Sequence, residues 1–219
     1  MPFDAVAEPK RKLGAALVPG PTGRQIGDDR IEPALPILSE TATFDSKTGE
    51  LRVVIETPKG SRNKYDYDPE CDCLDLATAL PEGMSFPYDF GFVPSTLGED
   101  GDPLDILVLM DVPVVPGCVI RARPLGAIEA KQKAKGEEWE RNDRLIAVAT
   151  HAQTHENVKS LEDLRPHLVD EIKAFFIEYN RLRGRKFKPL ALSGPGKSQK
   201  LIKSGMEAFK QSDRRKGRK

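Results

Sequence analysis

Between residues 51 and 149, short apolar runs alternate with turns that are rich in glycine and proline. Runs of this length, bounded by turn residues, are typical of β-strands. The predicted strands are residues 51–56, 64–67, 105–109, 118–123 and 145–149. The aromatic, proline-punctuated stretch 84–92 predicts a packed loop, and residues 130–143 predict a charged hairpin tip. Many short strands without intervening helices favour a closed β-barrel over a βαβ sheet.

Helical spacing begins only after residue 160. Residues 168–182 carry one apolar stripe at intervals of three and four, which predicts an amphipathic helix ending before Gly184. Ser160 and Asp163 have the spacing of a capping box ahead of it. A second helix, with one apolar and one basic face, is expected at about 198–211. The predicted fold class is therefore mainly β with flanking helices (α+β), the two helices lying at the C-terminal end.

Three regions differ in composition. Residues 1–45 hold six of the 18 prolines and show little periodicity, so we expect an N-terminal arm that is either extended over a neighbouring surface or disordered. Residues 46–212 form the predicted barrel domain, and 213–219 a basic tail. The formal net charge is zero, but residues 181–219 carry 14 Lys and Arg against 2 Asp and Glu, a net of +12. The preceding residues are correspondingly acidic, which suits a site for several metal ions.

Composition also indicates the cellular compartment in which the protein is expected. No apolar run approaches the roughly 20 residues of a membrane span, and the first residues lack the apolar stretch of a signal peptide. The three cysteines are odd in number, and no second cysteine pair follows Cys71 and Cys73 to complete a zinc site. We therefore expect a protein of the cytoplasm, with no membrane partner.

The strongest chemical signal is an aspartate-rich turn at residues 98–105. Asp100, Asp102 and Asp105 stand at i, i+2 and i+5, Gly101 and Pro103 enforce a tight turn between them, and a buried strand follows. Three carboxylates folded together repel one another unless a cation joins them. A hard divalent ion, Mg²⁺ or Mn²⁺, is the natural partner of an all-oxygen cluster. An Asx-rich surface turn without a metal is the alternative interpretation.

The same turn, DGDPLDILV, resembles that of family I soluble inorganic pyrophosphatases. The segments VVIETP (53–58), NKYDYD (63–68), FPYDFGF (86–92), DRLIAVA (143–149) and AFFIEY (174–179) extend the resemblance over residues 51–211. The resemblance implies an OB-like, five-stranded closed β-barrel, a homo-oligomer, several Mg²⁺ ions and hydrolysis of pyrophosphate to two phosphates. It implies that Asp102 is catalytic and that metals are held by Asp100, Asp102, Asp105, Glu56 and, in place of a lost ligand, Asp143. It further implies that substrate is bound by Lys64, Asp66, Arg144 and Tyr179.

Several positions depart from the family pattern. The resemblance expects an arginine at Thr78, a tyrosine at Phe90, an aspartate at Asn142 and a lysine at Asn180. Each lost charge-assisted hydrogen bond is worth roughly 1.5–3 kcal/mol, so uncompensated losses would weaken substrate binding severely. Basic residues close to these segments in sequence could compensate, namely Arg62, Arg181, Arg183, Arg185 and Lys186, and of these Arg183 could reach back toward the phosphates, although the sequence does not place them. Asp143 could replace the ligand lost at Asn142, although adjacent strand residues point to opposite faces.

Two other functions remain open at this stage. One is a metal-dependent phosphohydrolase that acts on another phosphoanhydride or ester. The other is a non-catalytic OB-like module whose basic end holds a phosphorylated ligand or single-stranded nucleic acid. Such modules usually interleave basic residues with exposed aromatics, and after residue 181 the only aromatics are Phe187 and Phe209. A nucleic-acid partner is therefore not expected.

Overall fold

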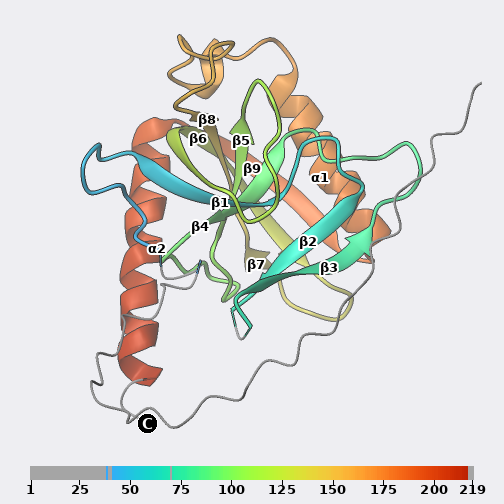
Figure 1. Cartoon of the computed structure of the whole chain (residues 1–219). Helices are drawn as coiled ribbons and strands as arrows, with labels where there is room; N and C mark the ends of the chain where they lie inside the picture. The colour runs from blue at the N-terminus through green and yellow to red at the C-terminus, as the bar shows by residue number, and fades with distance from the viewer. Residues whose placement is uncertain (1–37, 39–40, 70, 217–219) are drawn as a thin grey trace, which may run out of the picture. The chain divides into compact units, whose positions relative to one another are not determined.

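The computed structural model describes residues 38, 41–69 and 71–216, so most of the predicted N-terminal arm lies outside the described residues. Within them the chain forms nine strands, a 3-10 turn and two helices (Figure 1). In order these are β1 (Leu51–Thr57), β2 (Asn63–Asp68), β3 (Cys73–Ala79), β4 (Asp89–Val93), β5 (Leu104–Leu109), β6 (Val119–Lys133), β7 (Glu140–Arg141), β8 (Arg144–Ala149), the 3-10 turn (Leu161–Asp163), α1 (Leu168–Leu182), β9 (Lys186–Ser193) and α2 (Pro195–Lys216).

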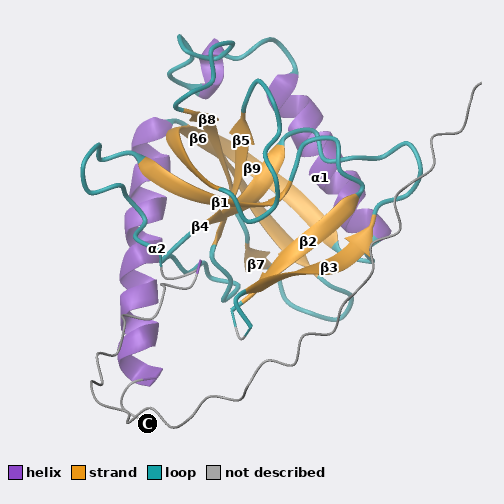
Figure 2. Ribbon diagram, viewed as in Figure 1, coloured by secondary structure: helices purple, strands orange, loops and turns teal. Residues whose placement is uncertain are grey.

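Five of the described strands close into a ring. β1 pairs with β4, β4 with β5, β5 with β8, β8 with β6, and β6 returns to β1. Only the β5–β8 pair in this ring is parallel. β7 and β9 extend the far end of the long strand β6, while β2 and β3 form a separate hairpin (Figure 2). The predicted closed arrangement of five strands is therefore confirmed.

The core fills the inside of this ring. The four residues 106–109 of β5 have no exposed surface, and every residue of β8 is buried. These strands are buried on both faces, and their apolar runs are accordingly continuous rather than alternating. The ring's mouth at the start of β5 and β8 is where the polar residues Asp105 and Arg144 stand, so the strand ends carry the chemistry and the strand bodies carry the core.

Both predicted helices are present. α1 covers residues 168–182 as expected, and Gly184 follows it in the left-handed region with φ of 71°. The capping box is also formed, since Asp163 accepts hydrogen bonds from the backbone N–H of Ser160 and from its hydroxyl, but it begins the short 3-10 turn rather than α1. α2 reaches Lys216, so the helix continues into the predicted basic tail.

The predicted loop at 84–92 is wrong at its C-terminal end. Residues Asp89–Val93 form β4, a central strand of the ring whose five residues are all buried. Its sequence gives no alternation of apolar and polar residues because both faces are covered. The prediction also missed β3 and β9. Both are largely exposed, so their composition is not that of a buried strand.

Two further observations concern cysteines and membranes. Cys71 and Cys73 form a disulfide at the tip of the β2–β3 hairpin, which the odd cysteine count did not predict, and Cys118 is free. Among the described residues no helix is both long and apolar enough to cross a membrane.

We predict that Gly91→Ala strongly destabilises the fold. A Cβ at Gly91 would lie 1.9 Å from the carbonyl oxygen of Val54 in β1, so β1 and β4 could not keep their pairing. We expect the free energy of unfolding to fall by about 3 kcal/mol or more in urea titrations.

The matched control is Gly196→Ala in α2. No atom lies within 4 Å of the added methyl, and alanine is the better helix former. This variant should be neutral or slightly more stable. Equal stability of the two variants would contradict the close approach of β1 and β4.

Candidate active site

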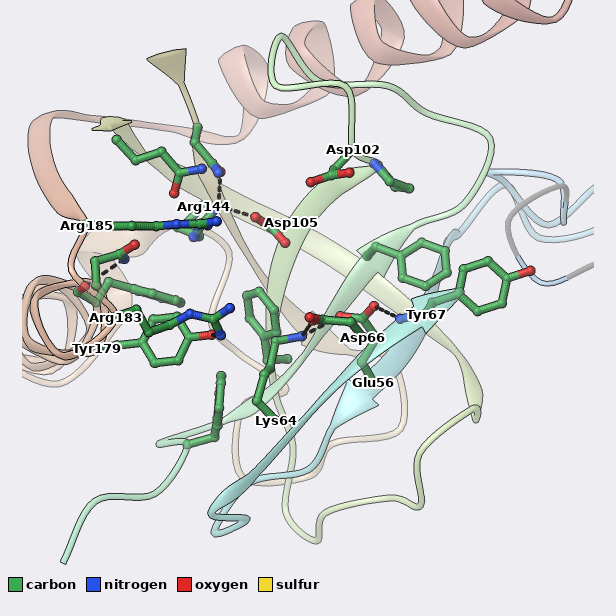
Figure 3. Close-up of a pocket in the computed structure, with 18 of the residues that line it drawn as sticks. Glu56, Lys64, Asp66, Tyr67, Asp102, Asp105, Arg144, Tyr179, Arg183 and Arg185 are labelled. Carbon is green, nitrogen blue, oxygen red and sulfur yellow. Dashed lines mark hydrogen bonds and ion pairs between the residues drawn. The ribbon is translucent and has the colours of Figure 1, made fainter. Parts of the chain in front are cut away.

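A cavity of about 380 Å³ opens at the mouth of the ring, beneath the β2–β3 hairpin and beside α1 (Figure 3). Its charged lining comes from five parts of the chain: the end of β1, the hairpin, the aspartate turn with the start of β5, the start of β8 and the turn that follows α1. The four carboxylates that line it are Glu56, Asp66, Asp102 and Asp105, and the four cations are Lys64, Arg144, Arg183 and Arg185.

Lys64 joins β2 to β1 inside this cavity. Its Nζ lies 3.1 Å from Glu56 Oε2 and also donates to the carboxylate of Asp66. Glu56 accepts a second hydrogen bond, of 2.9 Å, from the Tyr67 backbone N–H. Burial raises the pKa of the Glu56 carboxyl, and the Lys64 ammonium opposes that shift. Burial would lower the pKa of Lys64, but the neighbouring Glu56 and Asp66 carboxylates raise it above its usual value.

Arg144 makes the equivalent link between β8 and β5. It donates to the carboxylate of Asp105 and to the side-chain oxygen of Asn142, and only 4% of its surface is exposed. Its guanidinium lies over the ring of Phe176, at 5.0 Å from the centroid. Burial raises the pKa of the Asp105 carboxyl, and the Arg144 guanidinium opposes the shift. The Arg144 Nε is buried without a hydrogen-bond partner.

The aspartate turn has the predicted geometry in part. The Gly98 N–H donates to the Asp102 carbonyl oxygen at 2.7 Å, and Gly101 adopts a φ of 89°, which only glycine adopts readily. Asp102 and Asp105 face the main cavity, whereas Asp100 faces a second cavity of about 300 Å³ that Asp105 also lines. Burial, followed by repulsion from Asp105, raises the pKa of Asp100 to about 6.

The three aspartates are therefore close enough to interact but not as tightly gathered as the sequence suggested. Among the described residues, one set of three carboxylate, thiol or imidazole side chains has all its possible ligand atoms within 4.8 Å of one another. That set is Asp68, Cys71 and Cys73, and not the three aspartates of the turn. The carboxylate of Asp102 makes no ion pair or hydrogen bond with any described side chain, so it is open to the cavity.

Asp143 is placed apart from the main cavity. Its Oδ1 accepts hydrogen bonds from the Ala130 backbone N–H at 2.9 Å and from Arg141 Nε at 2.6 Å, and it lines the second cavity with Asp100 and Asp105. The neighbouring Arg144 turns into the main cavity instead, as expected for adjacent residues of a strand. Arg141 already neutralises the Asp143 carboxylate, so a metal bound there would compete with it.

The positions that depart from the family pattern carry no compensating group themselves. The Asn180 side-chain amide donates to the Phe176 carbonyl oxygen at 2.9 Å, and Asn142 is held by Arg144. Phe90 lies under the Lys64 ammonium, 5.0 Å from it. Thr78 stands opposite Lys64 in the hairpin and does not line the cavity.

Two cavity cations were missing from the predicted set of substrate-binding residues. Arg183 and Arg185 both enter the cavity from the turn after α1 (Figure 3). Two other nearby arginines are occupied elsewhere, since Arg62 pairs with Glu82 and Arg181 with Glu178. The signal in the sequence is the glycine between Arg183 and Arg185, which ends the helix and turns the chain back toward β9.

The donor set fits a hard divalent cation. Glu56, Asp102 and Asp105 supply only carboxylate oxygens to the main cavity, and Asp100 and Asp143 supply two more to the second. Oxygen ligands of this kind suit Mg²⁺ and Mn²⁺ rather than the softer metals that select sulfur. Lys64 and Arg144 at present neutralise two of these carboxylates, so a bound divalent ion would compete with them.

Comparison with known proteins agrees with this chemistry. A family model described as inorganic pyrophosphatase matches residues 53–210. The chain is 43% identical to the inorganic pyrophosphatase of Synechocystis sp. over 136 residues, which are 62% of this chain and 78% of that protein. It is 37% identical to the inorganic pyrophosphatase of Nostoc sp. over 75% of this chain and 94% of that one.

Solved structures lead to the same class. The crystal structure of the inorganic pyrophosphatase from Thermus thermophilus superposes with a TM-score of 0.72 at 31% sequence identity, covering 80% of this chain and 99% of that chain. The ring of strands, the cavity lined by carboxylates and cations, and these matches define a metal-dependent phosphoanhydride hydrolase. The chain belongs to the inorganic pyrophosphatase family.

We predict that Lys64→Met destabilises the protein in the absence of divalent ions. The substitution leaves Glu56 buried without a cation, and breaking one side of a buried pair typically costs about 3–5 kcal/mol. Adding Glu56→Gln to the same variant should recover part of this loss, because it removes the uncompensated charge.

Chemical denaturation of the metal-free protein measures both effects. Lys59→Met is the control, since Lys59 is an exposed lysine that lies over the Tyr88 ring and should change stability by less than about 1 kcal/mol. A double variant less stable than Lys64→Met would show that the Glu56 charge is not the cause.

Proposed function

We propose that this chain hydrolyses inorganic pyrophosphate to two phosphates in the main cavity. The observation that carries the proposal is that Asp102, Arg183 and Arg185 line the same cavity and none of them forms an ion pair with any residue that the structure describes. Such a cavity offers ligands for metal ions on one side and an attractive surface for a small polyanion on the other. Membership of the inorganic pyrophosphatase family supports it.

Divalent metal ions are part of this proposal, with Mg²⁺ as the ion and Mn²⁺ as the substitute. Glu56, Asp102 and Asp105 would hold them in the main cavity, with Asp100 and Asp143 available from the second. When bound, such ions neutralise the negative charge of the substrate and lower the pKa of a coordinated water.

The residues of the chain then have distinct roles. Asp102 holds the attacking water and accepts its proton as the water oxygen bonds to one phosphorus. The bridging P–O bond breaks, and the bridging oxygen leaves with the second phosphate. Lys64, Arg144 and Tyr179 orient the phosphate oxygens, while Asp66 acts through Lys64, to which it is paired.

We propose further that the protein acts in the cytoplasm as a homo-oligomer. The support for association is a set of exposed apolar side chains on β9. Leu190 and Leu192 expose 45% and 48% of their surface, two residues apart on a strand that is hydrogen-bonded only to β6 among the described strands. Apolar side chains in such a position are typical of surfaces that a partner covers.

We predict that the wild-type protein releases phosphate from pyrophosphate with Mg²⁺, and that Asp102→Asn lowers kcat by a factor on the order of 10² to 10⁴. The amide cannot accept the proton of the attacking water, and the loss of a general base has this magnitude. A phosphate-release assay measures both. Asp170→Asn, an exposed carboxylate on α1, should behave as wild type. No release by wild type above the Asp102→Asn background would refute the proposed reaction.

We also predict that Mg²⁺ raises the Tm of the metal-free protein and that Asp102→Asn reduces this rise. A ligand that binds only the folded state adds stability by mass action, about 2.7 kcal/mol at a hundredfold excess over its Kd. Asp102 is exposed and unpaired, so its replacement should leave the metal-free Tm unchanged. An equal Mg²⁺-induced rise in both proteins would remove Asp102 from the set of ligands.

A further inference from the structure

The turn that follows α1 presents two arginines to the cavity. Arg183 is the C-cap residue that follows α1, Gly184 reverses the chain with a φ of 71°, and Arg185 leads into β9. The Arg185 backbone N–H donates to the Asn180 carbonyl oxygen at 2.9 Å, which fixes this turn on the last residues of the helix. Both side chains consequently line the cavity from the side of α1 (Figure 3).

These two arginines differ from the other cations of the cavity in their partners. Lys64 is neutralised by Glu56 and Asp66, and Arg144 by Asp105. Neither Arg183 nor Arg185 forms an ion pair with any carboxylate among residues 38, 41–69 and 71–216. Two neighbouring positive charges without a counter-ion repel one another, and an anion bound between them relieves that repulsion.

A third donor lies with them. Arg183 Nη1 donates to the Tyr179 hydroxyl oxygen at 2.6 Å, and the guanidinium lies over the Tyr179 ring at 5.3 Å from its centroid. A guanidinium has no acceptor, so the hydroxyl must accept in this contact and its own O–H remains free to donate. Only 9% of Tyr179 is exposed, and the ring is held by contacts with Phe86 and Phe175.

We propose that Arg183, Arg185 and the Tyr179 hydroxyl form a phosphate subsite across the cavity from Asp102. It binds the phosphate that leaves, while the phosphorus under attack lies nearer Asp102. This inference rests on the proposed function for the identity of the substrate. The subsite itself requires only a small anion with a tetrahedral phosphate or phosphonate group, which the arginines bind through forked hydrogen bonds.

The test uses Arg183→Gln, Arg185→Gln and the double variant in two measurements. Steady-state hydrolysis of pyrophosphate gives KM and kcat, and calorimetry with Mg²⁺ gives the Kd of methylenediphosphonate, a P–C–P analogue that is not hydrolysed. We expect each single change to raise KM and Kd about tenfold or more, because each removes a charge-assisted bond to the anion. Arg185→Lys, which keeps the charge but not the fork, should lie between wild type and Arg185→Gln.

Arg181→Gln is the matched control. Arg181 lies two residues before Arg183, pairs with Glu178 on the exposed side of α1 and does not line the cavity. The KM and Kd of the Arg181→Gln variant should therefore equal those of wild type. Arg185 has no side-chain partner among the described residues, so Arg185→Gln tests the subsite without disturbing the fold.

The outcomes separate this inference from the proposed function. Wild type that binds methylenediphosphonate and loses affinity in both variants, yet releases no phosphate from pyrophosphate, would keep the subsite and overturn the reaction. Active enzyme with unchanged KM and Kd in Arg183→Gln and Arg185→Gln would overturn the subsite and keep the reaction. Wild type that fails to bind the analogue would also overturn the subsite.

Discussion

The structure depends on the cost of burying a carboxylate. Glu56 and Asp105 stand at strand ends inside the mouth of the ring, where burial raises the pKa of each. Each is matched by one buried cation from a different strand, Lys64 for Glu56 and Arg144 for Asp105. The pairs therefore have two effects at once: they link β2 to β1 and β8 to β5, and they keep both carboxylates in the cavity, where we propose that they bind metal ions.

This arrangement also separates negative charge on one side of the cavity from positive charge on the other. On the side of the aspartate turn and the hairpin, Glu56, Asp66 and Asp105 are paired with cations. The Asp102 carboxylate has no ion-pair partner among the described residues. On the side of α1, neither Arg183 nor Arg185 has a carboxylate partner among the described residues. In the proposed reaction, pyrophosphate with divalent ions matches both sides, because the ions would bind Asp102 and the phosphate oxygens would bind Arg183 and Arg185. Four carboxylates and four cations leave the cavity with little net charge, so we propose that the separation of the two charges, rather than their sum, selects the ligand.

Much of the fold could be predicted from the sequence, because the five predicted strands are continuous apolar runs or clear alternations. β4 could not, because a strand buried on both faces and bounded by aromatics resembles a packed loop. The residues of the candidate site were likewise predictable only in part. The family motifs identified the residues that reach the main cavity from strands, whereas the orientation of Asp143 toward Arg141 depends on how the chain turns just before β8. The arginines after α1 could be suspected but not placed, because their direction depends on where the helix ends.

The position of the end of α1, which carries these arginines, depends in turn on packing in the core. α1 is fixed by an aromatic cluster in which Phe176 contacts Phe90 from β4 and Phe187 from β9. The same Phe176 ring lies under the Arg144 guanidinium. Packing of one buried ring therefore sets the position of the helix end that carries Arg183 and of the cation that holds Asp105. A change in this cluster would move the arginines and the carboxylates relative to each other, although the cluster contains neither, because close-packed cores transmit displacement rather than absorb it.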